Sequence, residues 1–398
     1  MQKRTHIIIG ASAAGMGVLN QLRTLDPESN IVCIARDTAW PYNTCFLADY
    51  LSGTKQHEQL ALKPQEFFEK NSIKLMLGKE VISIDRVKRT ITLSDSTTYT
   101  YDTLFLGTGV SPRTLTLEGA DTSDALFYFH THDDAIKIKE FILNKPVKRA
   151  VVIGAGLSGL EVADSLNKNG IAVTIVEQSL QVLQHHADRA SMKLLKELAL
   201  SHNTTIMVNN AARALVTQND KLVGLDLVSG ERIDTSIIVI AIGALANSAL
   251  ARDAGLAIEY DAIVVNDVMQ TSDPAIFAGG DVCLVRERVS NRLMRNGAWP
   301  DAMHQGLIAA HSMAGVPKSY PGAVNIISSA FFGVHFFSCG PVMADDHGYK
   351  IKIMQGDGFY HKFLFEGDIL KGFLLVGNTQ KAAEYRKFYL AQVPFPFF

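Results

Sequence analysis

The residues with the clearest chemical pattern form a glycine-rich turn in the middle of the chain. Gly154, Gly156 and Gly159 follow an apolar run of buried-strand type, in the spacing Gly-x-Gly-x-x-Gly. Such glycines let the backbone approach a pyrophosphate, and the amino end of the next helix supplies free N–H groups and a partial positive charge. Glu177 comes about 20 residues later, where a carboxylate can accept both ribose hydroxyls. Because no nearby arginine could hold a 2′-phosphate, the pattern predicts a site for NAD rather than NADP.

A weaker copy of this turn lies near the start of the chain. Ser12 replaces the middle glycine, and the strand that follows the turn ends at Ala35, which cannot bind ribose. Two charged residues come directly after Ala35. The residues that this copy offers to a second dinucleotide are Gly10, Ser12, Ala14, Gly15, Arg36 and Asp37.

The two turns belong to an internal repeat. Residues 6–15 (HIIIGASAAG) resemble residues 150–159 (AVVIGAGLSG). Downstream, residues 103–109 (TLFLGTG) resemble a segment that ends at Gly243 (IIVIAIG). The repeat therefore includes both the strand before each glycine turn and a later strand that ends in glycine.

Strand candidates after each turn extend the repeat to βαβ units. They lie at residues 30–35 and 171–177, each after a helix-compatible stretch. The pattern predicts an α/β fold with two doubly wound, Rossmann-like dinucleotide-binding domains, one inserted in the other, and a small α+β C-terminal domain. The other expected elements are a hairpin at 79–94, helices at 133–144 and 301–314, strands at 351–354, 359–365 and 369–376, and a last helix at 380–390.

Composition and charge exclude several classes of protein. Apolar residues make up 47% of the chain and charged residues 20%, which is ordinary for globular domains and excludes disorder. The 38 Lys and Arg nearly balance the 40 Asp and Glu, for a net charge of −2. With no basic surplus, we expect neither nucleic acid nor a membrane surface as a partner.

The cysteine pattern indicates a reducing compartment. There is no CxxC pair and no Cys/His spacing of a zinc site, so we expect no metal. The first apolar segment begins five residues from Met1, which leaves no room for a secretion signal, and the longest apolar run, residues 237–251, is shorter than the roughly 18 to 20 residues of a membrane span. These features predict a soluble cytoplasmic protein. The cysteines are Cys33, Cys45, Cys283 and Cys339.

Over residues 1 to about 320 the sequence resembles the pyridine nucleotide-disulfide oxidoreductase superfamily. Besides the two turns, the match rests on residues 108–113 (TGVSPR) and residues 276–281 (IFAGGD). The resemblance implies an FAD-binding domain at 1–112 and 245–320, an NAD-binding domain at 113–244 and a C-terminal domain at 321–398.

The resemblance also implies roles for single residues. Asp281 would hydrogen-bond the ribityl chain of FAD, the backbone at Val81 would contact the adenine, and the helix opening at Trp299 and containing Ala302 would point its amino end at the flavin pyrimidine. Glu161 would lie at the junction of nicotinamide and flavin. The remaining expected cofactor contacts are Thr108, Gly109, Arg113 and Gly243.

Two subfamilies of this superfamily have different residues at the position of Cys45. Coenzyme A disulfide reductases, NADH oxidases and NADH peroxidases carry one redox-active cysteine at this position. The tail (residues 333–340) is similar instead to rubredoxin reductases and NADH nitrite reductases; rubredoxin-reductase-like enzymes place an Arg/Lys-Pro pair and a lysine where this chain has Thr44, Cys45 and Asp49. A thiolate beside the flavin could form a mixed disulfide, whereas a buried free cysteine is usually inert.

Together these features predict an FAD-dependent NAD(P)H oxidoreductase that takes hydride from NADH to the flavin. Three acceptors remain open: a small disulfide or persulfide through Cys45, a small redox protein such as rubredoxin, and dioxygen. Ala35 and Asp49 also leave open a non-catalytic flavin-binding sensor. The sequence is compatible with a monomer or a homodimer.

Overall fold

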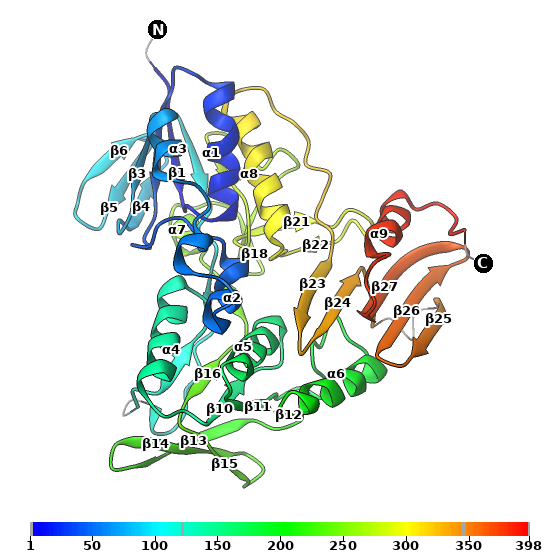
Figure 1. Ribbon diagram of the computed structural model, residues 1–398. Helices are drawn as coiled ribbons and strands as arrows, with labels where there is room; N and C mark the ends of the chain where they lie inside the picture. Colours follow the sequence, from blue (N-terminus) through cyan, green and yellow to red (C-terminus); the bar gives the residue numbers. More distant parts are fainter. Residues whose placement is uncertain (1–2, 121–122, 344–347, 397–398) are drawn as a thin grey trace. The chain divides into compact units, whose positions relative to one another are not determined.

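The computed structural model describes residues 3–120, 123–343 and 348–396, and the chain forms two compact units (Figure 1). The first unit runs to Cys45 and includes His57–Ser111 and Ala244–Val324. The second comprises Phe46–Gln56, Pro112–Gly243 and the chain from Asn325 onward. The C-terminal segment, expected as a third domain, therefore groups with the inserted domain. The assignment of one cofactor to each domain stays a prediction.

The first unit is built on a five-stranded parallel sheet. Its order, β20-β7-β1-β2-β3, places the first strand in the centre, as in a doubly wound fold. Ile7, Ile8 and Phe105 are fully buried, as expected for parallel strands covered on both faces. The strands are β1 (Thr5–Ile9), β2 (Asn30–Ile34), β3 (Ile73–Met76), β7 (Thr103–Leu106) and β20 (Ile276–Ala278).

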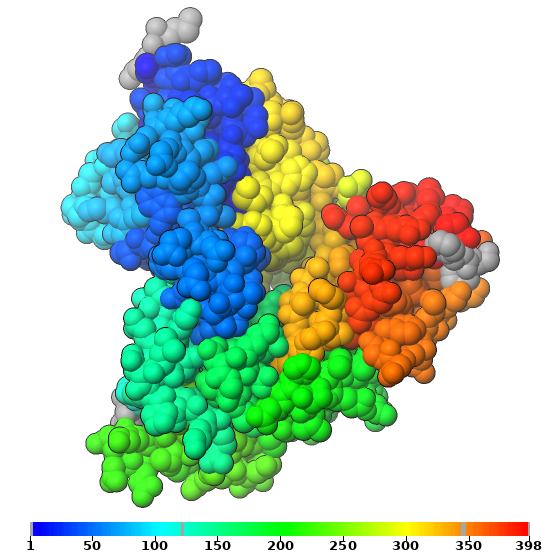
Figure 2. All heavy atoms as spheres, viewed as in Figure 1, coloured from blue at the N-terminus to red at the C-terminus, as the bar shows by residue number. Residues whose placement is uncertain are grey.

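Helices α1 (Ala13–Leu25) and α8 (Trp299–Met313) lie side by side in this unit (Figures 1 and 2). Their backbones touch: a Cβ added to Gly306 would lie 2.0 Å from the Ala14 carbonyl oxygen, and one added to Gly17 would lie 2.3 Å from the Met303 carbonyl oxygen. Glycine at both positions is therefore what lets α8 pack this closely on α1.

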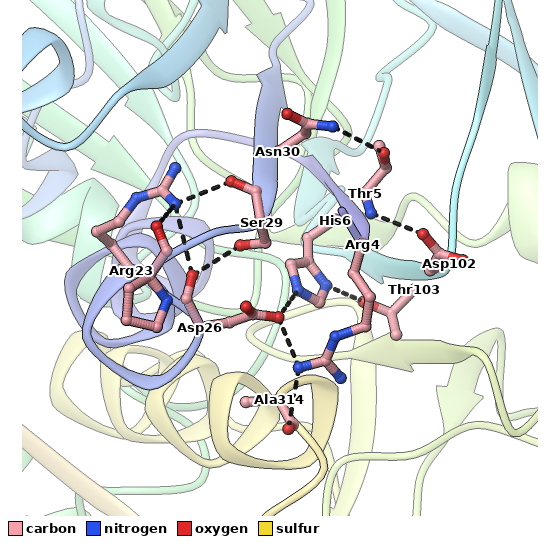
Figure 3. Close-up of polar contacts among 11 residues, drawn as sticks. Arg4, Thr5, His6, Arg23, Asp26, Ser29, Asn30, Asp102, Thr103 and Ala314 are labelled. Atoms are coloured by element: carbon pink, nitrogen blue, oxygen red, sulfur yellow. Dashed lines mark hydrogen bonds and ion pairs between the residues drawn. The ribbon is translucent and has the colours of Figure 1, made fainter. Parts of the chain in front are cut away.

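A polar network closes the end of this sheet away from the glycine turn (Figure 3). The buried His6 ring lies 2.7 Å from the Thr103 hydroxyl and 3.0 Å from the Asp26 carboxylate, which also pairs with Arg4 at 2.6 Å. Burial lowers the pKa of His6 although Asp26 opposes this effect. Arg4 also donates to the carbonyl of Ala314, so the network ties both central strands to the end of α8.

Smaller elements complete the first unit. The expected hairpin at 79–94 is present as β4 and β5. The elements are α3 (Gln65–Lys70), β4 (Val81–Asp85), β5 (Thr90–Leu93), β6 (Thr98–Thr100), α7 (Ala249–Asp253), β18 (Ile258–Glu259), β19 (Ala262–Val264), β21 (Cys283–Arg286), β22 (Leu293–Met294) and the 3-10 turn His57–Leu60. Strands β8 (Val110–Pro112) and β17 (Ala244–Ala246) lie where the chain passes from one unit to the other.

The second unit also contains a five-stranded parallel sheet, which differs from the first in where one outer strand occurs in the sequence. Its order is β12-β11-β10-β16-β9, and all neighbours are parallel. The outer strand β9 precedes β10 in the chain, whereas its counterpart β20 in the first unit comes last. These two sheets confirm the predicted α/β fold with two doubly wound domains. The strands are β9 (Leu126–Tyr128), β10 (Arg149–Ile153), β11 (Ala172–Val176), β12 (Thr204–Met207) and β16 (Ile238–Ile240).

Helix α5 (Leu157–Lys168) explains why residues 46–56 belong to this unit. The Ser165 hydroxyl donates to the carbonyl of Ala48 (2.8 Å), and the Asn169 amide donates to that of Leu51 (3.0 Å). These carbonyls belong to the short helix α2 (Leu47–Ser52). The unit also contains α4 (His132–Asn144), α6 (Arg189–Ser201), β13 (Ala212–Gln218), β14 (Lys221–Leu227) and β15 (Arg232–Asp234).

The C-terminal segment forms an antiparallel five-stranded sheet, in the order β23-β24-β27-β26-β25, with one helix. Three strands and the helix match the predicted positions; β23 and β24 were not among them. Phe373 stacks on Phe337 and meets the ring of Tyr385, so aromatic packing joins the sheet to the helix. The elements are β23 (Ile326–Phe331), β24 (Val334–Cys339), β25 (Lys350–Gly356), β26 (Phe359–Glu366), β27 (Ile369–Gly377) and α9 (Ala382–Ala391).

Candidate cofactor sites

The first glycine turn has a backbone that only glycine permits. Gly10 has φ +104°, and a Cβ there would lie 2.2 Å from the Gly107 carbonyl oxygen. A Cβ on Gly15 would lie 1.9 Å from the carbonyl oxygen of Gly10. Ser12 is the N-cap of α1 and makes no side-chain capping bond, so the first N–H groups of the helix face the turn. This is the cradle that a pyrophosphate requires.

Three predicted FAD contacts meet beside this turn. Gly280 has φ +82°, and a Cβ there would lie 3.1 Å from the Ala14 Cβ and 3.8 Å from the Ala302 Cβ. Its N–H donates to the side-chain oxygen of the buried Gln305 (2.7 Å). Asp281 follows directly, so the structure brings Ala14, Asp281 and Ala302 together although they lie far apart in the sequence.

Asn247 holds the Thr108–Gly109 segment, and sequence reasoning missed it. Its amide donates to the Thr108 carbonyl (2.9 Å), and its N–H donates to the Gly109 carbonyl (2.9 Å). The Thr108 hydroxyl donates to the Asn247 carbonyl, and the Ser111 hydroxyl donates to its side-chain oxygen (both 2.8 Å). Asn247 is separated from Thr108 by 139 positions, and no motif marks it.

The charged residues after β2 are engaged with nearby groups. The Asp37 carboxylate accepts the Ala39 N–H and the Tyr42 hydroxyl, both at 3.1 Å. The exposed Arg36 guanidinium lies 3.7 Å from the Glu80 carboxylate, next to the buried Val81. Asp37 therefore shapes the loop after β2, and Arg36 and Val81 lie close together along its edge.

The second turn repeats the geometry of the first. Gly154 has φ +107°, and a Cβ there would lie 2.4 Å from the Ala241 carbonyl oxygen. A Cβ on Gly159 would lie 2.0 Å from the Gly154 carbonyl oxygen. Around Gly156, no described residue beyond its immediate chain neighbours has an atom within 4 Å of an added Cβ, so the middle of the turn is open. The turn fits a second pyrophosphate, and the nearby strand end is fixed by the Arg113 N–H, which donates to the Gly243 carbonyl (2.9 Å).

Glu177 is held at the mouth of this turn by three hydrogen bonds. Its carboxylate accepts the Ala155 N–H, the Ser179 N–H and the Ser179 hydroxyl, each at 2.7 Å. A carboxylate offers about four acceptor positions, so capacity for one further donor remains. The predicted contact with two ribose hydroxyls stays a prediction, and it would require Glu177 to give up one of these three bonds. In the structure, Glu177 also fixes the turn itself.

Glu161 is bound by the C-terminal segment. The Ser329 hydroxyl on β23 donates to its carboxylate at 2.6 Å. Burial raises the pKa of Glu161; the Ser329 bond opposes this rise, and the charges of Asp49 and Asp164 add to it. Ser329 lies 168 positions away and carries no motif, so the sequence could not reveal this partner.

Replacing Glu161 with glutamine is expected to stabilise the chain at neutral pH. Because the folded-state pKa is raised above 4.5, the wild type loses stability as the pH rises through that pKa, whereas glutamine can still accept the Ser329 bond. Unfolding by urea between pH 4 and pH 8 measures the difference in unfolding free energy between the variant and the wild type. This difference should become smaller as the pH falls. The exposed Glu140→Gln on α4 is the control. A wild type as stable as the variant at pH 8 would contradict the prediction.

Cys45 is exposed in the structure. It lies in the 3-10 turn Thr44–Phe46, and its N–H donates to the side-chain oxygen of Asn43 (3.0 Å). Helix α2 begins only at Leu47 and has Asp49 in its first turn. The other three thiols are buried, and burial raises the pKa of Cys33 to about 12. Among the four thiols, Cys45 is therefore the one that solvent and a substrate can reach.

The described residues fit two dinucleotides. Each doubly wound sheet has a glycine turn in which two glycines have their Cβ positions blocked by backbone, and each turn opens a helix longer than eight residues. In the part of the chain that the structure describes, no group of three or more His, Cys, Asp or Glu side chains could hold a metal ion. Within the same residues, no helix has both the length and the apolar character that crossing a membrane requires.

Three known proteins illustrate what the chain is similar to. It is 29% identical to a rubredoxin-NAD(+) reductase of Pseudomonas putida, over 79% of this chain and 81% of that protein. The reduced CoADR-RHD of Bacillus anthracis has a TM-score of 0.92 at 25% identity, over 99% of this chain and 75% of the other. The covalent putidaredoxin reductase–putidaredoxin complex has a TM-score of 0.89 at 26% identity, over 99% and 94%.

Two family models match the sequence. Residues 330–390 match the rubredoxin NAD+ reductase C-terminal domain. Residues 4–306 match the pyridine nucleotide-disulphide oxidoreductase model. The chain therefore belongs to the pyridine nucleotide-disulphide oxidoreductase family and is an FAD-dependent NAD(P)H oxidoreductase.

Proposed function

We propose that this enzyme passes electrons from NADH to a small redox protein of the rubredoxin or ferredoxin type. The observation that carries the proposal is the C-terminal segment. Residues 330–390 match the rubredoxin reductase C-terminal domain. Ser329, which binds Glu161, directly precedes them on strand β23. The similarity to the Pseudomonas putida rubredoxin reductase supports it.

The residues of the chain have separate tasks in this reaction. The turn at Gly154–Gly159, with Glu177, would bind NADH, and the turn at Gly10–Gly15, with Asp281, would bind FAD. The amino end of α8 beside Asp281 would favour negative charge on the flavin through its dipole. FAD, when bound, supplies the step from a two-electron hydride donor to one-electron acceptors. Glu161, held by Ser329, would hold a proton near the nicotinamide.

Reduction of a small disulfide or persulfide is the second candidate, because Cys45 is exposed. A thiol attacks as its thiolate, which needs a nearby cation or dipole. The residue after Cys45, Phe46, has the Lys55 ammonium 4.3 Å from its ring centroid, while α2 presents the Asp49 carboxylate. Because the first turn of the helix that follows Cys45 carries a carboxylate rather than a cation, we favour the redox protein as the acceptor.

Cys45→Ser is expected to leave electron transfer to rubredoxin within about twofold of wild type, because the thiol takes no part in it. NADH-dependent rates with rubredoxin, coenzyme A persulfide and dioxygen measure this. A neutral quinone dye is the control for NADH-to-flavin transfer, and its rate should not change. A wild type that reduces the persulfide faster than rubredoxin, with that activity lost in Cys45→Ser, would reverse the assignment. Fast oxygen consumption by both forms would instead indicate an oxidase.

The proposal includes the cellular setting. All four cysteines are thiols, which suits the reducing cytoplasm, where NADH is available. Membership in an oxidoreductase family argues against the non-catalytic sensor, and rapid loss of the flavin absorbance on adding NADH would exclude it.

A further inference from the structure

A hairpin of the first unit concentrates positive charge. Strands β21 and β22 pair antiparallel, with Arg286 opposite Leu293. Four arginines fall within this hairpin and the residues that follow it, and all four are exposed. None of them forms an ion pair with any residue that the structure describes. The four are Arg286, Arg288, Arg292 and Arg295.

The local charge is opposite in sign to that of the whole chain. The chain has a net charge of −2, whereas the acidic residue within this stretch is the buried Glu287. The Glu287 carboxylate accepts the N–H groups of Val289 (3.0 Å) and Ser290 (2.6 Å), so it is used to shape the loop. The four arginines outnumber the exposed Asp267 that lines the adjoining pocket, so they present a net cationic surface.

The hairpin is rigid enough to serve as a docking surface. The Arg288 N–H donates to the Ala323 carbonyl, and the Ala323 N–H donates to the Arg286 carbonyl, both at 2.8 Å. Gly322 has φ +97°, and a Cβ there would lie 3.0 Å from the Arg286 carbonyl oxygen, so the two segments touch. A preformed surface loses little entropy on binding.

The surface also offers apolar contact and a recess. Leu293, opposite Arg286, is 38% exposed. A pocket of about 140 Å³ beside the hairpin is lined by Arg286 and Arg288 and also by the acidic residues Asp267 and Glu287. Because two acidic residues share this recess with two arginines, the exposed arginines around the recess, rather than the recess itself, suit the carboxylates of a partner.

The hairpin begins and ends at the predicted flavin site. Asp281 precedes β21 by two residues, and a Cβ added to Gly297 would lie 3.6 Å from its carboxylate. Arg295 is two residues from Gly297, so the two backbones are within about 7 Å. A protein seated on the Arg295 end of the hairpin would therefore lie near the predicted flavin site.

We propose that this arginine hairpin is the docking surface for an acidic small redox protein. This inference rests on the proposed function, because it names the chemistry of the acceptor's surface. Charge attraction of this kind acts mainly on the association rate and falls steeply with ionic strength.

The test compares two double variants in the holoenzyme. Arg288→Glu with Arg292→Glu reverses two hairpin charges. Lys70→Glu with Lys88→Glu makes the same change in net charge at exposed positions on α3 and on the β4–β5 turn of the same unit. Both are assayed with NADH and an acidic rubredoxin from low to high salt, and with a neutral quinone.

The hairpin variant should lower kcat/KM for rubredoxin about tenfold or more at low salt. The difference should vanish near 1 M salt, where the screening length is about 3 Å. The lysine variant should retain most of the wild-type rate, and the quinone rate should be equal in all forms.

The failures of the two proposals are distinguishable. If the wild type reduces rubredoxin but both double variants behave alike, the docking surface is wrong and the proposed function stands. If the wild type reduces no acidic redox protein at any salt concentration, the proposed function itself fails and the inference with it. Binding of a DNA duplex that is lost in the hairpin variant, with a rubredoxin rate independent of salt, would assign the arginines to a nucleic acid instead.

Discussion

Gly154→Val is expected to abolish reduction by NADH while FAD stays bound. The substitution places a Cβ 2.4 Å from the Ala241 carbonyl oxygen, at φ +107°, so the turn must move. The first glycine turn, Asp281 and Ala302 lie in the first unit and Gly154 in the second, so flavin retention should not change. We expect kcat/KM for NADH to fall at least about hundredfold. Stopped-flow loss of the flavin absorbance measures it, and chemical reduction by dithionite confirms that the flavin is intact.

Two further variants test the reason for this effect. Gly156→Ala adds a Cβ that meets no described residue within 4 Å beyond its chain neighbours, so the fold should be unchanged. The methyl group enters the open middle of the turn, so KM for NADH should rise. Gly170→Ala introduces the same methyl at φ +77°, in open space after α5, and should leave NADH turnover intact. A normal NADH rate in Gly154→Val, or loss of its FAD, would show that this turn does not hold the nicotinamide nucleotide.

Among the single substitutions proposed for this chain, Lys362→Met is expected to lower the free energy of unfolding the most. Lys362 on β26 is 2% exposed, and its ammonium lies 3.3 Å from the buried Asp188 carboxylate. Burial raises the pKa of Asp188, but bonds from Ser191 and Tyr360 and the charge of Lys362 outweigh this, so the net shift is downward. Removing Lys362 would leave that carboxylate buried without its cation, at a cost of about 3 kcal/mol.

The double variant Asp188→Asn with Lys362→Met separates charge from packing. It removes both charges, and asparagine can still cap α6, so most of the stability should return. Urea unfolding followed by far-UV circular dichroism gives the free energies. The wild-type pair should lose its contribution as the pH falls through the lowered pKa of Asp188, and the double variant should not. If the single variant and the double variant were destabilised equally, the packing of Lys362, and not its charge, would be what stabilises this region.

Local patterns predicted the turns and most elements of the fold. The spacing of Gly10 and Gly15, and of Gly154 and Gly159, is a backbone requirement, so it is visible in the sequence. The helix predicted at 133–144 is present as α4, because Thr131 and Asp134 form a capping box that fixes its start. Such signals need only a few neighbouring residues.

Contacts between distant residues could not be predicted. Ser329 and Glu161 are 168 positions apart, and Asn247 and Thr108 are 139 apart, so nothing local marks either pair. The position of residues 46–56 in the second unit depends in the same way on Ser165 and its bond to Ala48. The arginines of the hairpin lie close together in the sequence, but they become one surface only when β21 pairs with β22.

The place of β9 in the chain has a consequence for the order in which the two sheets can form. All five strands of the second sheet lie between Leu126 and Ile240, because β9 comes first. The first sheet is complete only after β20 at Ile276–Ala278 has been synthesised. Helix α8 must then pack on α1, from which all the strands of the second sheet separate it in the sequence. Short loops close faster than long ones, and domains fold as they leave the ribosome. We therefore expect the inserted sheet to be complete while the strands of the enclosing sheet still lack their outer neighbour and expose apolar surface.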